Sequence, residues 1–204
     1  MVIKIVLVIW MAAVVAASFL YLPPAKGFAD PEAARLIVYH VPCAVIATIA
    51  FLIAALFAVS YLGKRDSSYD AKSAVSCELG LIFAALATIT GSIFARFEWN
   101  SWWNWDPRET SIVILLLIYA AYFALRSAVE DNEKRARLSA VYAILALPAM
   151  GFLMFIMPRV MPSLHPSSAH LGTEYRIVLY SAMLGFLGIY VWLFRAKLKR
   201  DLNK

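Results

Sequence analysis

Long apolar stretches alternate with short polar segments along the whole of this chain. Six stretches are each close to the roughly 20 residues that an α-helix needs to cross a bilayer. They cover roughly residues 5–22, 36–62, 77–95, 111–128, 138–157 and 176–195. The pattern predicts an all-α integral membrane protein, a six-transmembrane-helix bundle that forms a single domain over residues 1–204.

The composition supports a membrane protein and argues against a soluble one. Hydrophobic residues make up 63% of the 204 residues and charged residues only 16%, against about 25% in a typical soluble domain. The first stretch lacks a small-residue cleavage site, so we expect it to be a retained span and not a removed signal peptide. The net charge of +6 comes from residues in short loops between apolar runs, and we expect no nucleic-acid partner.

The Lys and Arg residues predict the orientation of the bundle. Thirteen of the 19 fall on the side of the N-terminus, and six fall on the other side. Because positive residues accumulate on the cytoplasmic side, both termini are expected to be cytoplasmic. We therefore expect a multi-pass protein of the cytoplasmic (inner) membrane. The connections 23–35, 96–110 and 158–175 would face the periplasm or exterior.

The cysteines and the other polar connections do not indicate a redox or nucleotide-binding site. The two cysteines, Cys43 and Cys77, belong to different stretches and form no CxxC motif, so we expect small packing residues and not a redox pair. The connections at 64–72 and 130–137 are polar and mixed in charge, with no glycine-rich phosphate-binding loop. Nothing in these segments predicts an ATPase.

The connection before the fourth stretch concentrates tryptophan. Four of the six tryptophans of the chain fall within seven positions: Trp99, Trp102, Trp103 and Trp105. An ordinary interfacial belt spreads its rings over many helix ends, so this density favours a platform for a large flat apolar ligand. A plainer alternative is an interfacial anchor. On a short helix, Trp99, Trp102, Trp103 and Asp106 would share one face and could lie in the headgroups.

Asp106 also has a structural explanation. The run Asp106-Pro107-Arg108-Glu109 has a good N-cap residue, proline at the first helical position and glutamate at the third. This order is typical of a helix start with a capping box. We therefore expect Asp106 to cap the helix of the fourth stretch.

All three histidines, His40, His165 and His170, fall on the predicted outer side. A haem iron takes two axial ligands, commonly His. The porphyrin prefers aromatic surface, and its propionates prefer cations at the water boundary. Zinc would instead need three or four clustered ligands, and the chain has no such cluster.

A single interfacial His can also be a simple polar cap, and His170 is the one that best fits that explanation. The outer side offers the cations Arg35, Arg96, Arg108 and Arg159.

Residues 99–110 resemble the WWD signature of the haem-handling proteins of cytochrome c maturation, the CcmC, CcmF and CcsA superfamily. Asn100 stands where the signature usually has glycine. The run Tyr39-His40-Val41-Pro42 and the run around His165 resemble the two outer histidine segments of CcmC-type proteins. Arg35, five residues before the first histidine, also matches the pattern of CcmC-type proteins. With six spans and this length, the resemblance covers nearly the whole chain.

The resemblance implies a role for each candidate residue. His40 and His165 would be the axial ligands of a haem b bound transiently and without covalent attachment. Arg35 and Arg108 would hold the propionates, and Asp106 would brace the loop by capping the next helix. The aromatic platform would consist of Trp99, Trp102, Trp103 and Trp105.

The resemblance also implies partners and a non-enzymatic role. A CcmC-type protein would bind haem at the outer face and present it to a periplasmic haem chaperone of the CcmE type. An ABC-type CcmAB complex and CcmD would be further partners. The run from Asp106 to Thr110 is closer to CcsA or CcmF, so a CcsA-type subunit of a cytochrome c haem lyase is an alternative. A membrane scaffold anchored by its tryptophans is another. A b-type electron-transfer subunit would need histidine pairs within the membrane, which the sequence lacks.

Overall fold

The structure, a computed structural model, describes residues 2–165 and 171–202, and in this part of the chain all regular structure is helical. Six of the helical stretches are long and apolar enough to span a membrane, which confirms the predicted all-α fold. In chain order the elements are α1 (Val2–Leu20), the 3₁₀ turn η1 (Ala33–Leu36), α2 (Ile37–Lys64), α3 (Ser67–Trp99), α4 (Pro107–Ala128), α5 (Asn132–Gly151), the π-helical turn η2 (Phe152–Ile156), α6 (Met157–Val160) and α7 (Thr173–Leu202).

Most of the helices are longer than the apolar stretches that predicted them. The largest difference is at α3, which begins at Ser67 although its apolar stretch begins near residue 77. Asp66 caps this helix, because its side chain accepts a hydrogen bond from the backbone N–H of Ser68 at 2.8 Å. Hydropathy finds only the apolar part of a span and misses polar turns that extend beyond it.

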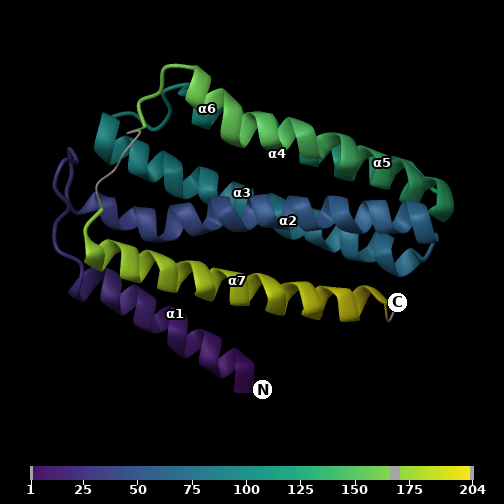
Figure 1. The fold of residues 1–204 in the computed structure, drawn as a ribbon, viewed down its shortest axis with the longest axis horizontal. Helices are drawn as coiled ribbons and strands as arrows, with labels where there is room; N and C mark the ends of the chain where they lie inside the picture. Colours follow the sequence, from purple (N-terminus) through teal and green to yellow (C-terminus); the bar gives the residue numbers. More distant parts are fainter. Residues whose placement is uncertain (1, 166–170, 203–204) are drawn as a thin grey trace.

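The connections gather at the two ends of the bundle (Figure 1). Helix α1 begins and α7 ends toward the same end, on the right of the figure. The connections that follow α1 and α3, together with the end of α6 and the start of α7, lie at the other end, on the left, and we call it the tryptophan end. The three connections predicted to share a side therefore do so. That this side is periplasmic remains a prediction from the Lys and Arg residues.

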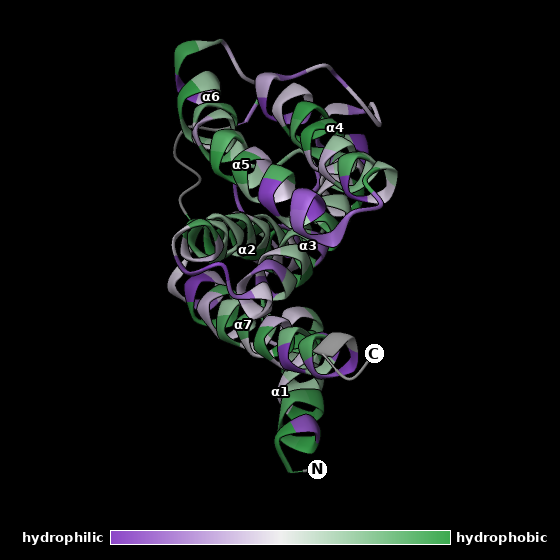
Figure 2. Cartoon of the chain, turned by 90° about the vertical axis from the view of Figure 1, so that its right-hand side faces the viewer, coloured by the Kyte–Doolittle hydropathy of each residue, from purple (hydrophilic) through white to green (hydrophobic). Residues whose placement is uncertain are grey.

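The bundle has three layers (Figure 2). Helices α2 and α3 form the middle layer, with α4 and α5 on one side and α7 on the other, and α1 packs against the outer side of α7. Helix α2 presents small side chains to its neighbours: Ala47, Ala50, Ala54 and Ala58 are all buried. Small residues at this spacing let helices approach closely in a membrane, where dispersion contacts replace the hydrophobic effect.

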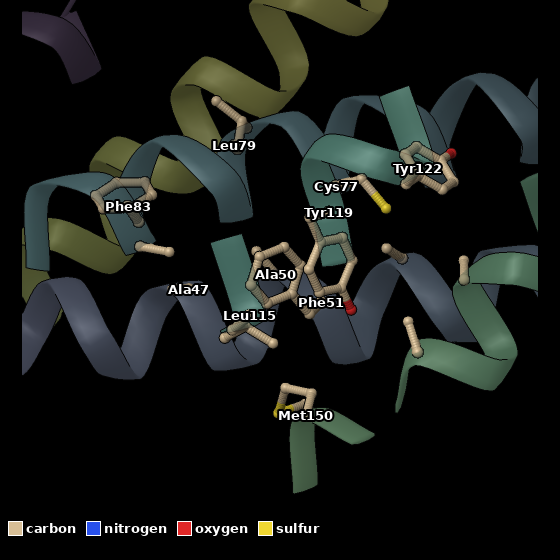
Figure 3. Close-up of a cluster of buried hydrophobic side chains, with 14 of the residues drawn as sticks. Ala47, Ala50, Phe51, Cys77, Leu79, Phe83, Leu115, Tyr119, Tyr122 and Met150 are labelled. Atoms are coloured by element: carbon tan, nitrogen blue, oxygen red, sulfur yellow. The ribbon is translucent and has the colours of Figure 1, made fainter. Parts of the chain in front are cut away.

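The large core side chains lie between α2, α3 and α4 (Figure 3). The rings of Phe51 and Tyr119 stack with centroids 3.5 Å apart and planes within 10°. Gly80 leaves room for Phe51, because a Cβ at Gly80 would lie 2.5 Å from its ring. Both cysteines are free and buried, as expected of packing residues.

The tryptophan segment is not the short helix of the anchoring alternative. Helix α3 ends at Trp99, and residues 100–106 form no helix. Asn100 ends α3 in the left-handed conformation at a φ of 55°, and Trp105 has the same φ. Arg96 fixes this turn, because its Nη1 donates to the backbone oxygen of Asn100 at 2.8 Å. The anchoring alternative is therefore wrong about a short helix, and these tryptophans do not share one helical face.

Candidate functional site

A pocket opens at the tryptophan end of the bundle. Its cavity volume is about 140 Å³, and it is partly open to solvent. Its walls come from α2, α3, α4, the π-helical turn, α6 and the two segments that connect α3 to α4 and α6 to α7. The candidate residues that line it are His40, Trp99, Trp103, Arg108 and His165.

His40 lies in the first turns of α2 and is held by α3. Its Nδ1 is 3.0 Å from the backbone oxygen of Ala87 and 3.3 Å from Oγ1 of Thr90. A carbonyl oxygen can only accept, so Nδ1 carries the proton and donates it to Ala87. The lone pair is then on Nε2, which bonds to no residue in the described part of the chain. Gly91 makes room for the ring, because a Cβ there would lie 2.9 Å from Cε1 of His40.

His165 lies on the coil that follows α6. Its Nδ1 is 3.1 Å from Oδ1 of Asp106, and its ring meets that of Trp99 edge to face at 4.9 Å. Burial lowers the pKa of His165, the Asp106 carboxylate raises it and Arg108 lowers it, with a net pKa below the ordinary value. Nδ1 donates to the carboxylate, so the lone pair of the neutral ring is on Nε2.

Asp106 joins the two segments that form this side of the pocket. Its side chain is almost fully buried and accepts hydrogen bonds from the backbone N–H of Arg108 (2.9 Å), the Ser163 hydroxyl (2.8 Å), the backbone N–H of Leu164 (2.6 Å) and His165. Burial raises the pKa of Asp106, but these donors outweigh it and hold the pKa below its usual range. The predicted cap and capping box are confirmed. The tie to His165 was not predicted.

The four tryptophans divide into two pairs. Trp99 and Trp103 line the pocket, whereas Trp102 and Trp105 are 58% and 72% exposed. The rings of Trp103 and Trp105 meet at 86° with centroids 6.0 Å apart. The structure therefore places two rings in the wall and two on the outer surface, instead of one continuous platform.

The two candidate propionate partners, Arg35 and Arg108, lie in different places. Arg108 lines the pocket at the N-terminus of α4. Arg35 does not: its Nη1 pairs with the Glu32 carboxylate at 2.7 Å and its Nη2 donates to the backbone oxygen of Leu22 at 3.2 Å. Only Arg108 is brought to the pocket. His170 lies outside the described residues.

Glu109 is a pocket residue that the sequence suggested only as part of a capping box. It is 8% exposed, and its Oε2 accepts from the backbone N–H groups of Asn104 (2.6 Å) and Asp106 (3.3 Å). It thereby holds the end of the tryptophan segment against α4. Its other oxygen is buried and has no hydrogen-bond partner among the described residues, and the same holds for Nε1 of Trp103.

The residues of the pocket suit a haem better than a bare metal ion. A porphyrin supplies four nitrogen ligands, so the protein needs to add only two, and His40 and His165 each offer a free Nε2. Each Nδ1 is held by a fixed acceptor, the arrangement that orients metal-binding histidines. In the part of the chain that the structure describes, no group of three or more His, Cys, Asp or Glu side chains could hold an ion alone.

Comparisons with known proteins give a consistent result. The family model "Heme exporter protein C" (CcmC) matches residues 1–200. The protein of that name from Paracoccus denitrificans is 28% identical over 196 residues, which cover 87% of this chain and 79% of that protein. The one from Rhodobacter capsulatus is 32% identical over 127 residues, 62% of this chain and 52% of that protein. "Cytochrome c biogenesis protein CcsA" from Prochlorococcus marinus is 34% identical, but over only 41% of this chain and 26% of that protein.

Proposed function

The chain belongs to the heme exporter protein C (CcmC) family, which handles haem in cytochrome c biogenesis, and we propose that it binds haem between His40 and His165 and delivers it to a periplasmic chaperone of the CcmE type. One observation carries this proposal. Both rings line one pocket, each with Nδ1 held by a fixed acceptor and Nε2 free. This arrangement would let both imidazoles hold one haem iron through Nε2.

The remaining residues have supporting roles. Trp99 and Trp103 provide aromatic surface for the porphyrin, and Arg108 provides a guanidinium for a propionate. Asp106 keeps His165 in the tautomer that leaves Nε2 free. We assign the propionate role to Arg108 in preference to Arg35, because Arg35 is already paired with Glu32.

A transient, non-covalent haem b fits the chain. Attachment through a thioether would need a thiol at the pocket, but Cys43 and Cys77 are buried in the helical core and neither lines the pocket. The proposed role is binding and transfer, without a bond-making step by the protein itself. The exposed Trp102 and Trp105 offer apolar surface beside the pocket for the chaperone.

The proposal places the protein in the cytoplasmic (inner) membrane with the tryptophan end in the periplasm, as the Lys and Arg residues predict. A CcmAB-type ABC complex and CcmD would be its membrane partners. The competing role is that of a CcsA-type haem lyase subunit, which the partial similarity to a CcsA protein supports.

Co-expression with a CcmE-type chaperone tests the proposal. The chaperone should carry haem beside the wild-type protein and lose it beside the double variant H40A/H165A, at equal levels of both proteins in the membrane. Equal loading of the chaperone with the double variant would overturn the transfer role. Normal loading together with lost attachment of haem to cytochrome c would favour the lyase role instead.

A further inference from the structure

The helix that leads to His165 changes its geometry where it reaches the pocket. Helix α5 continues into the π-helical turn η2, in which the backbone N–H of Met157 bonds to the carbonyl of Phe152, five residues back. In a regular α-helix the N–H of residue 158 would bond to the carbonyl of Met154, but Pro158 has no N–H and its ring would press on that carbonyl. Widening of the helix here relieves this conflict, and such turns often occur at functional sites.

The widened turn brings a thioether to the pocket. Leu153 and Met154 are consecutive residues of this turn, and both line the pocket that His40 and His165 line. Leu153 has no donor atom. Met154 has a sulfur that makes no hydrogen bond in the described part of the chain, on a flexible, unbranched side chain.

Met157, one helical turn further along, provides an internal comparison. Its sulfur accepts a hydrogen bond from the Ser111 hydroxyl at 3.3 Å, and Met157 is not among the residues that line the pocket. The two methionines therefore have the same chemistry and lie on the same segment, but only Met154 is available to a ligand in the pocket.

The two histidines differ in how the structure holds them. His40 stands on α2 and is held by α3, whereas His165 stands on coil and is held through Asp106. A transfer protein has to give up one axial bond while it keeps the haem in place. Loss of the His165 bond would leave a vacant axial position at an iron that His40 still holds.

We propose that Met154 is an alternative axial ligand, which binds the iron through Sδ when His165 leaves it. The inference rests on the proposed haem-binding function. The Fe–Nε2 bond to His165 breaks and an Fe–S bond to Met154 forms. Both ligands are neutral, so no electron or proton is transferred. Thioethers are soft ligands, and a His/Met pair raises the haem potential relative to two histidines. Met154 thus keeps the haem bound during transfer and favours the reduced iron.

Spectra of the haem-loaded protein in the H165A background test the assignment. H165A should keep a six-coordinate, low-spin haem with the weak long-wavelength charge-transfer band of a ferric thioether complex and with a more positive potential than the wild type. The variant H165A/M154L should become five-coordinate and high-spin. The matched control H165A/M157L should keep the spectrum of H165A.

The outcomes separate this inference from the proposed function. A wild-type protein without haem would contradict the proposed function itself. A low-spin wild type with a high-spin H165A would overturn the role of Met154 and leave the two histidine ligands standing. The role of Met154 would also be overturned if H165A were low-spin and H165A/M154L had the same spectrum.

Discussion

His40 stands on a long helix in the middle layer of the bundle, whereas His165 stands on coil that one buried carboxylate ties to the rest of the site. The His40 ring lies against the backbone of α3, at Ala87 and Gly91. The His165 ring depends on Asp106, which also holds Ser163 and Leu164. Under the proposed function, this difference would let one pocket hold haem and still release it, because His40 is fixed in the helical bundle and His165 lies on a separate coil segment.

The largest expected effect comes from Asp106→Ala. This substitution removes the cap of α4, worth about 1 kcal/mol, together with every hydrogen bond that the carboxylate makes to the His165 segment. Loss of such an orienting partner typically costs about 10- to 100-fold in metal affinity. Titration of the detergent-purified protein with haem should show a decrease in affinity of this size.

Asp131→Ala is the matched control for Asp106→Ala. Asp131 caps α5, where its side chain accepts from the backbone N–H of Lys134 at 2.7 Å, away from any histidine. It should cost only the roughly 1 kcal/mol of a helix cap and leave haem affinity unchanged. Equal losses of affinity in the two variants would mean that Asp106 acts only as a cap.

Gly91→Ala should disturb the fixed side of the pocket. The new methyl group would lie 2.9 Å from Cε1 of His40, and overpacking of this kind costs about 1–3 kcal/mol. The ring would lose its place at Ala87, and we expect roughly tenfold weaker haem binding with a high-spin fraction in the absorption spectrum. Gly63→Ala, on the same helix as His40 with nothing within 4 Å of the new Cβ, should leave the spectrum unchanged.

Ser163→Ala should weaken the contacts that hold the segment carrying His165. It removes a single hydrogen bond to Asp106 (2.8 Å), and a buried hydrogen bond contributes about 1 kcal/mol. Haem should dissociate about fivefold faster to an acceptor such as apomyoglobin, with an unchanged equilibrium spectrum. Ser127→Ala, which removes an exposed bond within α4, should leave the rate as it is. An unchanged rate in Ser163→Ala would mean that the segment is not what holds His165.

The smallest expected effect is that of Arg108→Gln, which is compared with Arg35→Gln. Arg108→Gln should weaken haem binding by about threefold, because an exposed charge pair contributes up to about 1 kcal/mol. Arg35→Gln should leave binding unchanged, since its guanidinium pairs with Glu32 away from the pocket. A weaker affinity in Arg35→Gln alone would return the propionate role to Arg35.

The sequence predicted the features that depend on neighbouring residues. Long apolar runs gave the six spans, and the order of residues from Asp106 to Glu109 gave the cap of α4. The pairing of Arg35 with Glu32, three residues before it, could have been found in the same way. The conformation of the tryptophan segment was harder to predict, because a helical interpretation of its spacing ignores the left-handed turn at Asn100.

The contacts that make the site functional join residues far apart in the chain. The bond from His165 to Asp106 and the space that Gly91 leaves for His40 depend on how helices pack. No local pattern encodes these contacts. The π-helical turn at Met154 lies between the two cases: Pro158 indicates an irregular helix, but only the packing shows that the turn faces the pocket.

Ligation of the iron is the most direct test of haem binding between His40 and His165. We would record absorption and electron paramagnetic resonance spectra of the haem-loaded wild type beside H40A and H40A/H165A. We expect a low-spin ferric haem with two histidine ligands in the wild type, a loss of that signal in H40A and no low-spin haem in the double variant. A wild-type spectrum that persists in H40A/H165A would contradict it, because other residues would then hold the iron.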